Sequence, residues 1–311
     1  MRVAILGATS HIAKDLVLSF AARSSDELSL FARRPSMVTE WLEFVGLSNQ
    51  CVVADFGAFG PELQFDAIIN FVGAGAPAQI SIIGASIFDI TLKYDDMALD
   101  YVRQHPECKY LFLSSGAAYG SDFAKPASDS TKAVIPINAL QPQDWYGVAK
   151  LHAEGRHRSL SHLQIVDIRV FSYFSRTQDL TAGFLITDIL RAVSSRVVLK
   201  ISPTYIVRDY LHPSDFYQLI HSLLAASTVA GVVDCYTLAP IDKVLLLDAM
   251  AKTFDLRFEI IDESAGVNAT GVKPYYYSLS RRASQYGYQP VLTALEGVMQ
   301  EASIIVRNLR P

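Results

Sequence analysis

The stretch Val3-Ala4-Ile5-Leu6-Gly7-Ala8-Thr9-Ser10-His11-Ile12-Ala13 decides the fold of this chain. It begins as a short apolar strand, turns at Gly7 and continues directly into a helical pattern. A strand, a glycine turn and a helix in this order can hold a dinucleotide, because backbone N–H groups at the helix start bind a pyrophosphate. Such a turn has three glycine positions, and here Ser10 occupies the second and Ala13 the third.

These two substitutions leave two interpretations open. A serine hydroxyl can itself bond a phosphate, so the turn still predicts a cofactor site. A Rossmann-like domain that has lost its cofactor would show the same changes. Under the first interpretation the cofactor contacts are Gly7, Thr9, Ser10, His11 and Ile12.

Short apolar segments alternate with helical stretches along the first half of the chain. The expected strands are 2–6, 28–32, 51–54, 67–71, 109–113 and 164–170, and the clearest helices are 12–22 and 95–104. Their spacings of about 20 to 40 residues suit strand-helix units. The alternation predicts an α/β fold, a Rossmann-like doubly wound parallel sheet.

After about residue 171 the alternation of strands and helices becomes less regular. We expect residues 1–170 to form the dinucleotide-binding domain and 171–311 to form mainly a smaller C-terminal substrate-binding lobe, with later segments able to return to the first domain. Segments 183–194 and 231–273 are assigned to that lobe. The polar stretch 121–144 is expected to be a loop over the cleft.

Composition excludes several classes of partner. The 311 residues are half hydrophobic, which suffices for a large core, and the net charge of -4 gives no reason to expect nucleic acid or an anionic membrane as partner. Three separated cysteines suit reduced thiols, and no apolar run approaches the roughly 18 residues that span a bilayer. We therefore expect a cytoplasmic protein that binds neither nucleic acid nor membrane.

Three histidines near the middle of the chain could suggest a metal. His152, His157 and His162 recur at five-residue intervals, which does not align them on one helical face. We expect a solvated helix there and no metal site.

A candidate acid/base pair lies at Tyr146 and Lys150. Residues four apart share one face of a helix, so the ammonium of Lys150 is expected to lower the pKa of the Tyr146 phenol toward the working range. With 15 tyrosines, the spacing can also arise by chance. The segment 110–120 strengthens the pair, because it is an apolar strand that ends in hydroxyl residues and glycine. Catalytic side chains belong at such carboxyl ends of parallel strands.

Together with the first turn, these segments resemble the extended short-chain dehydrogenase/reductase family, in its nucleotide-sugar epimerase, dehydratase and reductase branch. The resemblance runs over nearly the whole chain. It implies a catalytic triad of Ser115, Tyr146 and Lys150, in which the serine orients the substrate carbonyl. It also implies a homodimer that pairs through helices at about 95–104 and 145–160.

The end of the second expected strand bears on the cofactor. Arg33 and Arg34 stand where an acidic residue would hold the ribose hydroxyls of NAD. Arginine cannot accept a hydrogen bond but pairs well with a 2′-phosphate, so NADP is favoured and NAD stays possible. The alternative is two solvated arginines before a proline turn. The resemblance adds cofactor contacts at Asp55, Phe56, Phe71, Val72 and Gly73.

Motifs in the second half bear on the substrate. The segment 208–212, Arg-Asp-Tyr-Leu-His, is similar to the family signature whose arginine binds the diphosphate of a sugar nucleotide, a role that falls to Arg208. Ser172 replaces the asparagine that approaches the substrate in the family, which suggests an unusual substrate. Gly116 and Ala117 replace the acidic pair of the 4,6-dehydratases, which argues against dehydration.

These observations predict an NADPH-dependent reductase that acts on the keto group of a nucleotide-activated sugar, of the 4-keto-6-deoxy type. Tyr146 would protonate the oxygen, Ser115 would hydrogen-bond it, and Lys150 would hold the nicotinamide ribose. One alternative is a 4-epimerase that uses bound NAD. Another is a regulator that senses NADP without turnover, and the intact triad argues against it.

Overall fold

The structure is a computed structural model that describes residues 1–73, 77–261 and 273–309. Its centre is a seven-stranded sheet in the order β11-β6-β5-β4-β1-β2-β3, with every neighbouring pair parallel. The strands are β1 (Arg2–Leu6), β2 (Glu27–Phe31), β3 (Cys51–Ala54), β4 (Ala67–Asn70), β5 (Lys109–Ser115), β6 (Ile165–Val170) and β11 (Gly231–Asp234). The predicted Rossmann-like parallel sheet is confirmed.

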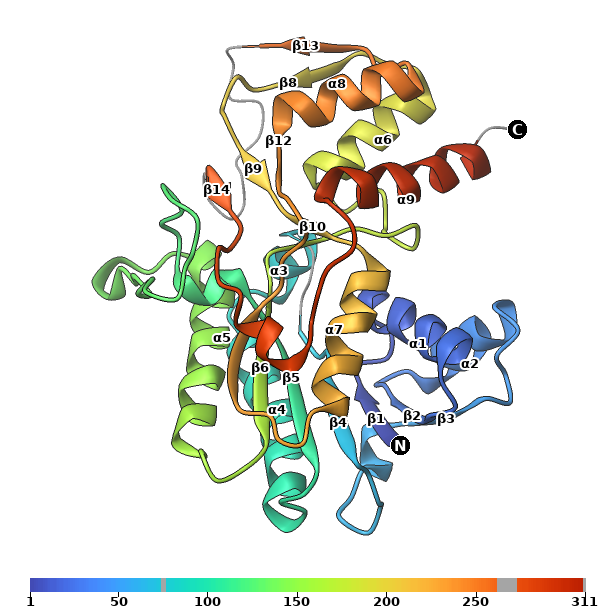
Figure 1. Ribbon diagram of the computed structural model, residues 1–311, viewed down its shortest axis with the longest axis vertical. Helices are drawn as coiled ribbons and strands as arrows, with labels where there is room; N and C mark the ends of the chain where they lie inside the picture. The colour runs from blue at the N-terminus through green and yellow to red at the C-terminus, as the bar shows by residue number, and fades with distance from the viewer. Residues whose placement is uncertain (74–76, 262–272, 310–311) are drawn as a thin grey trace.

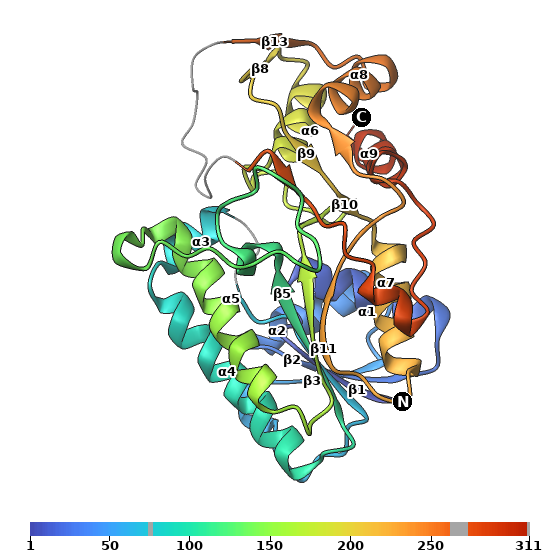
Figure 2. The same cartoon turned by 60° about the vertical axis from the view of Figure 1, so that its left-hand side comes forward.

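Helices pack on both faces of this sheet (Figures 1 and 2), because successive apolar side chains of each strand point to opposite faces. Val3 and Ile5 of β1 point into a core shared with α1 (His11–Arg23), α2 (Pro35–Phe44) and α7 (Pro213–Ala225). Ala4 and Leu6 point into the opposite core, which α4 (Ser86–Gln104) and α5 (Pro142–Ser159) cover. A strand turns successive side chains to opposite faces, so one short apolar strand supports both layers.

The expected strand positions agree closely with the structure, and two elements differ. β5 runs two residues beyond the expected end and so includes Ser114 and Ser115. α4 begins at Ser86 rather than at residue 95. Its first turns bury Ile87 and Thr91 but leave the apolar Leu92 exposed, so the apolar residues there do not form one recognisable stripe.

The smaller lobe lies above the carboxyl ends of the sheet strands (Figure 1). Its core is formed by α6 (Leu185–Ser195), α8 (Lys243–Phe254) and α9 (Ala294–Leu309), with the paired strands β8 (Leu199–Ile201) and β13 (Phe258–Ile260) beside them. The expectation for segment 231–273 was wrong at its start, because Gly231–Asp234 pairs with β6 in the central sheet. The repeated valines of β11 fit a buried sheet edge beside β6.

The remaining elements are short. They are β7 (Ser172–Tyr173), β9 (Val207–Arg208), β10 (Tyr210–Leu211), β12 (Ile241–Asp242), β14 (Tyr275–Tyr276), α3 (Pro77–Ile83) and the single-turn helices η1 (Phe56–Ala58), η2 (Gly116–Tyr119), η3 (Ile137–Ala139) and η4 (Arg282–Tyr286). Within residues 1–73, 77–261 and 273–309, no helix combines the length and apolar character that crossing a membrane requires.

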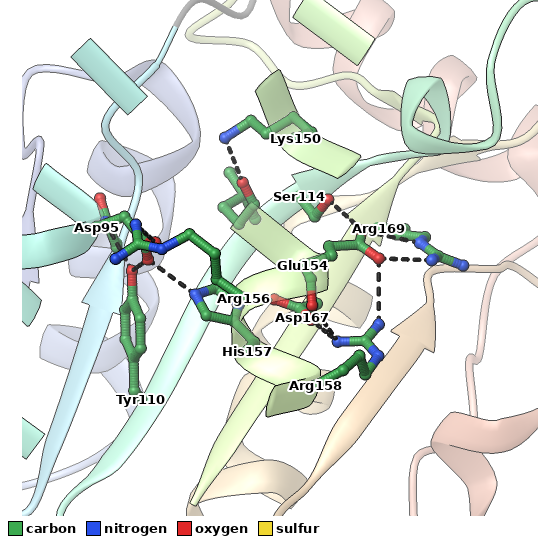
Figure 3. Close-up of polar contacts among 12 residues, drawn as sticks. Asp95, Tyr110, Ser114, Lys150, Glu154, Arg156, His157, Arg158, Asp167 and Arg169 are labelled. Atoms are coloured by element: carbon green, nitrogen blue, oxygen red, sulfur yellow. Dashed lines mark hydrogen bonds and ion pairs between the residues drawn. The ribbon is translucent and has the colours of Figure 1, made fainter. Parts of the chain in front are cut away.

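Buried charges join α5 to the sheet (Figure 3). The Glu154 carboxylate is 2% exposed and accepts hydrogen bonds from Ser114 Oγ at 2.6 Å, Arg169 Nε at 2.9 Å and Arg158 Nη2 at 3.1 Å. Arg169 also lies 3.6 Å from Asp234 on β11. One carboxylate on α5 therefore connects this helix to β5 and β6.

His157 holds a second buried cluster, and the expectation of a solvated helix was wrong for this residue. Its Nδ1 lies 2.5 Å from Asp167 and its Nε2 lies 2.8 Å from Asp95. Burial lowers the pKa of His157, but the two carboxylates outweigh this effect and raise the pKa to about 9. The charged imidazolium thus links α4, α5 and β6.

This shift predicts how stability depends on pH. The folded-state pKa of about 9 exceeds the unfolded value of 6.5, so the stabilisation is complete below about pH 6.5 and is lost as the pH rises through about 9. About 2.5 pKa units correspond to about 3 kcal/mol of unfolding free energy. Urea titrations of the wild type and His157→Gln should show this loss in the wild type alone. The exposed His152→Gln on the same helix is the control, and an identical pH dependence of wild type and His157→Gln would contradict the prediction.

Candidate active site

The first turn presses against the end of β4. Gly7 has φ 83°, and a Cβ at this position would lie 2.9 Å from the backbone nitrogen of Val72. Both the backbone conformation and the lack of space require glycine here. Ser10 is the N-cap of α1, and its side chain makes no capping hydrogen bond, so its hydroxyl stays available at the helix start.

His11 adds an unused polar atom to this turn. Its Nε2 is buried without a hydrogen-bond partner among the described residues, and burial lowers its pKa to about 4. The ring packs near Tyr173, with 5.6 Å between ring centroids. A neutral imidazole with free hydrogen-bonding capacity beside a helix N-terminus is compatible with a bound polar ligand.

The arginines after β2 lie beside the same turn. The backbone nitrogens of Gly7 and Ala8 both donate to Phe31 O, at 2.9 and 3.2 Å, which places the end of β2 against the turn. Arg33 and Arg34 are exposed, and neither forms an ion pair within the described part of the chain. Their guanidinium groups are therefore available to a phosphate.

The ends of β3 and β4 complete this edge of the sheet. Asp55 accepts hydrogen bonds from Gly57 N at 2.8 Å and Ala58 N at 3.2 Å and so caps η1, while the neighbouring Phe56 packs 4.4 Å from the ring of Tyr94. After β4, the buried Phe71 packs against α7, and Val72 N donates to Asn70 Oδ1 at 2.9 Å. A Cβ on Gly73 would lie 3.5 Å from Lys150 Nζ, so this segment reaches the predicted triad.

The structure brings Ser115, Tyr146 and Lys150 together. Ser115 ends β5 and caps η2, with its Oγ accepting from Ala117 N at 3.2 Å, and it lies close enough to the Tyr146 phenol to affect its pKa. Lys150 Nζ lies 5.9 Å from the centre of the Tyr146 ring, as expected for residues on one face of α5. The same ammonium donates to Leu113 O at 2.8 Å (Figure 3).

The electrostatics of the triad differ from the expectation. Burial raises the pKa of Tyr146, and the nearby Tyr276 phenol adds to this effect, while the hydrogen bond with Ser115 opposes it. Burial lowers the pKa of Lys150 to about 8, although Asp95, Glu154 and Asp167 favour its charged form. The expected lowering of the Tyr146 pKa was wrong for this structure, because the lysine is directed to Leu113 and to the ring of Phe112 instead.

Tyr276 is a residue of this centre that the sequence did not reveal. Its hydroxyl lies 3.2 Å from Ser115 Oγ, although the two residues are 161 positions apart. The run of three tyrosines at 275–277 was the signal that could have indicated it.

Two cations lie against the ring of Tyr276. The Arg208 guanidinium is 5.8 Å and Lys273 Nζ is 4.9 Å from the ring centre. Neither forms an ion pair within the described residues. Burial and the charge of Arg208 together lower the pKa of Lys273 to about 8, although Asp144 opposes this effect. Unpaired, largely buried cations of this kind suit a phosphate or diphosphate group.

The surroundings of the serine exclude an acidic neighbour. A Cβ on Gly116 would lie 2.4 Å from the ring of Phe171, so a carboxylate at this position has no space. Ser172 follows Phe171 and pairs with Tyr210 in the two-stranded sheet of β7 and β10. A cavity of about 20 Å³ beside η2 is lined by Ala117, Gly147 and Lys273.

Other polar residues in the segment 208–212 and elsewhere around the site have structural contacts. Asp209 accepts from Thr237 N at 3.1 Å, Asp215 accepts from Val291 N at 3.3 Å, and His212 caps α7. Arg281 is exposed and lies 4.2 Å over the ring of Tyr236. In the part of the chain that the structure describes, no three His, Cys, Asp or Glu side chains are grouped so that they could hold a metal ion.

Known structures resemble this chain over its whole length. A UDP-glucose 4-epimerase from Stenotrophomonas maltophila, with NAD and formylated UDP-arabinopyranose, has a TM-score of 0.81 and 17% identity, covering 99% of this chain and 98% of that one. A UDP-glucuronic acid 4-epimerase from Bacillus cereus, with UDP-glucuronic acid and NAD, has a TM-score of 0.77 and 15% identity, covering 99% and 100%. A dTDP-glucose 4,6-dehydratase from Bacillus anthracis, with NAD, has a TM-score of 0.78 and 15% identity, covering 99% and 97%.

A search of curated protein sequences finds no match. The model of the NAD dependent epimerase/dehydratase family matches residues 3–235, which include the first turn, the triad and the Arg208 motif. This match confirms the family resemblance that the first turn and the segments around Ser115 and Tyr146 indicated. The chain therefore belongs to the NAD-dependent epimerase/dehydratase family.

Proposed function

We propose that this protein performs NAD(P)-dependent oxidation and reduction at one carbon of a nucleotide-activated sugar, with epimerisation at that carbon as the overall reaction. The observation that carries the proposal is the meeting of Ser115, Tyr146 and Lys150 beside the end of β4, with Arg208 and Lys273 close by. The names of similar structures, two of them 4-epimerases with NAD, support epimerisation over simple reduction.

The residues of the first turn fit a dinucleotide. Gly7 leaves a space that a side chain would fill, Ser10 offers a free hydroxyl, and His11 Nε2 lacks a partner among the described residues. When bound there, the nicotinamide would accept and return a hydride. Lys150, next to Gly73 at the end of β4, would hold the nicotinamide ribose.

The remaining steps belong to side chains of this chain. The Tyr146 hydroxyl would take the proton from the sugar hydroxyl and later return it, while Ser115 hydrogen-bonds the same oxygen. Arg208, with Lys273, would bind the diphosphate and so fix the sugar in the cleft. Dehydration has no support, because Gly116 and Ala117 offer no carboxylate and Phe171 fills the adjacent space.

A second candidate is reduction of a 4-keto-6-deoxy nucleotide sugar by NADPH. The exposed Arg33 and Arg34 favour this candidate. A reductase binds NADPH from solution for each turnover, and the two guanidinium groups can pair with the 2′-phosphate of NADPH. We also propose a homodimer that pairs through the outer faces of α4 and α5, which pack against each other on one side of the sheet (Figure 2).

One experiment separates these functions. The purified protein is incubated with UDP-glucose, UDP-glucuronic acid or a 4-keto-6-deoxy nucleotide sugar, each with NAD or NADPH. Interconversion of epimers without net change in the cofactor supports the epimerase, and stoichiometric consumption of NADPH with the keto sugar supports the reductase. Tight cofactor binding without turnover of any substrate would favour a sensor and contradict the proposal.

The arginines after β2 predict the cofactor preference. We expect the wild type to bind NADPH at least about tenfold tighter than NADH, about 1.4 kcal/mol, which one charge-assisted phosphate contact can supply. Arg33→Ala combined with Arg34→Ala should remove the difference, and the exposed Arg307→Ala on α9 should not. Calorimetric titration measures all affinities. Equal affinities in the wild type would contradict the prediction and remove the support that Arg33 and Arg34 give to the second candidate, the NADPH-dependent reductase.

A further inference from the structure

Tyr276 reaches the catalytic serine from a part of the chain remote from the triad. It lies on β14, which pairs with β9, whereas Ser115 and Tyr146 lie at the end of β5 and on α5. The Tyr276 ring packs edge-on against Phe123 and Phe171, with centroids 4.8 and 5.3 Å apart. These contacts fix the ring, so its hydroxyl has a defined position beside Ser115 Oγ.

The hydrogen bonds of Ser115 leave one arrangement that serves every group. A serine hydroxyl has one proton and two acceptor positions. The Oγ accepts from Ala117 N and contacts two phenols, those of Tyr276 and Tyr146. Its single proton can go to only one of them.

Either hydroxyl of the Ser115–Tyr276 contact can be the donor. If Ser115 gave its proton to Tyr276, none would remain for the reacting oxygen beside Tyr146. The arrangement that serves the proposed reaction therefore has Tyr276 donating its own proton to the free acceptor position of Oγ. Burial raises the pKa of Tyr276 and so keeps its proton on the hydroxyl, although the charge of Arg208 beside the ring opposes this effect.

We propose that Tyr276 is a positioning residue that donates its hydroxyl proton to Ser115 and thereby directs the serine proton toward the reacting oxygen. The inference rests on the proposed function, because that oxygen belongs to the sugar that lies between Ser115 and Tyr146. Chained hydrogen bonds polarise one another, so the Tyr276 hydroxyl also makes Ser115 a stronger donor. Without it, the serine hydroxyl can rotate away from the reacting oxygen.

The test is a double-mutant cycle between Tyr276→Phe and Ser115→Ala. The full-length protein is assayed on whichever of UDP-glucose, UDP-glucuronic acid or the 4-keto-6-deoxy sugar the wild type converts. Tyr276→Phe keeps the ring packing and should lower kcat about tenfold, about 1.4 kcal/mol, with KM and the cofactor affinity changed less than about threefold. In the Ser115→Ala background the same change should have no further effect on kcat, because Tyr276 acts through that serine.

Tyr275→Phe is the matched control, because it is the neighbouring residue on β14 and packs against Tyr205 instead. It should leave kcat unchanged. Additive losses in the double variant, an increase in KM instead of a decrease in kcat, or wild-type activity of Tyr276→Phe would overturn the inference and leave the proposed function intact. A wild type that converts none of the substrates would overturn the proposed function, and the inference with it.

Discussion

Tyr146→Phe is expected to lower turnover of the nucleotide sugar by about 10² to 10⁴, the usual contribution of general acid/base catalysis. Under the proposed function, the Tyr146 hydroxyl exchanges a proton with the substrate oxygen, and no proton can come from a phenylalanine ring. The phenylalanine ring fills the same buried space, so the cofactor dissociation constant should change less than about threefold. Steady-state kinetics and calorimetric titration measure the two effects.

Lys150→Met gives the contrasting outcome. It should weaken both turnover and cofactor binding, because the buried ammonium lies beside Gly73 as well as Tyr146. If Tyr146→Phe kept more than about a tenth of wild-type activity, the tyrosine would not be the proton donor. The family's fold would then be present with a different mechanism.

Glu154→Ala is expected to lower the free energy of unfolding by about 3 to 5 kcal/mol, because it leaves a buried charge without its partner. Arg169 has only 12% of its side chain exposed and makes two of its hydrogen bonds to Glu154. Ser114 would also lose its acceptor. Urea denaturation measures the loss.

An exposed ion pair on α4 provides the control for this prediction. Asp100 and Arg103 are 68% and 44% exposed, and their contact at 2.8 Å resembles those of the buried cluster in length. Asp100→Ala should cost less than about 1 kcal/mol, since solvent screens the pair. If the two variants lost equal free energy of unfolding, burial of Glu154 would not determine how much its ion pairs contribute to stability.

The parts of the structure that depend on local patterns could be predicted from the sequence. Apolar runs located six strands, Gly7 located the first turn, and the four-residue spacing placed Tyr146 and Lys150 on one helical face. These features depend on neighbours in sequence. The match of the family model over residues 3–235 confirms the family that they indicated.

The parts that depend on long-range packing could not be predicted. Tyr276 meets Ser115 through pairing of β14 with β9, and nothing near Tyr276 in sequence specifies this contact. The burial of His157 depends on Asp95 and Asp167 from other elements, although a histidine among charged residues usually lies in solvent. The direction of Lys150 toward Leu113 likewise depends on tertiary structure.

The path of the chain between the two lobes has a consequence for folding. After β6 the chain enters the smaller lobe at α6, returns for α7 and β11, and crosses again to α8 and α9 (Figure 1). The face of α1 that packs on α7 is therefore covered only when residues about 200 positions later have been added. The edge of β6 is likewise paired only when β11 has been added. Contacts at such separation carry a large loop-closure entropy and slow folding. During synthesis, the dinucleotide-binding half would leave the ribosome with an unpaired strand edge and an uncovered apolar face, a state that invites aggregation until the C-terminal residues arrive.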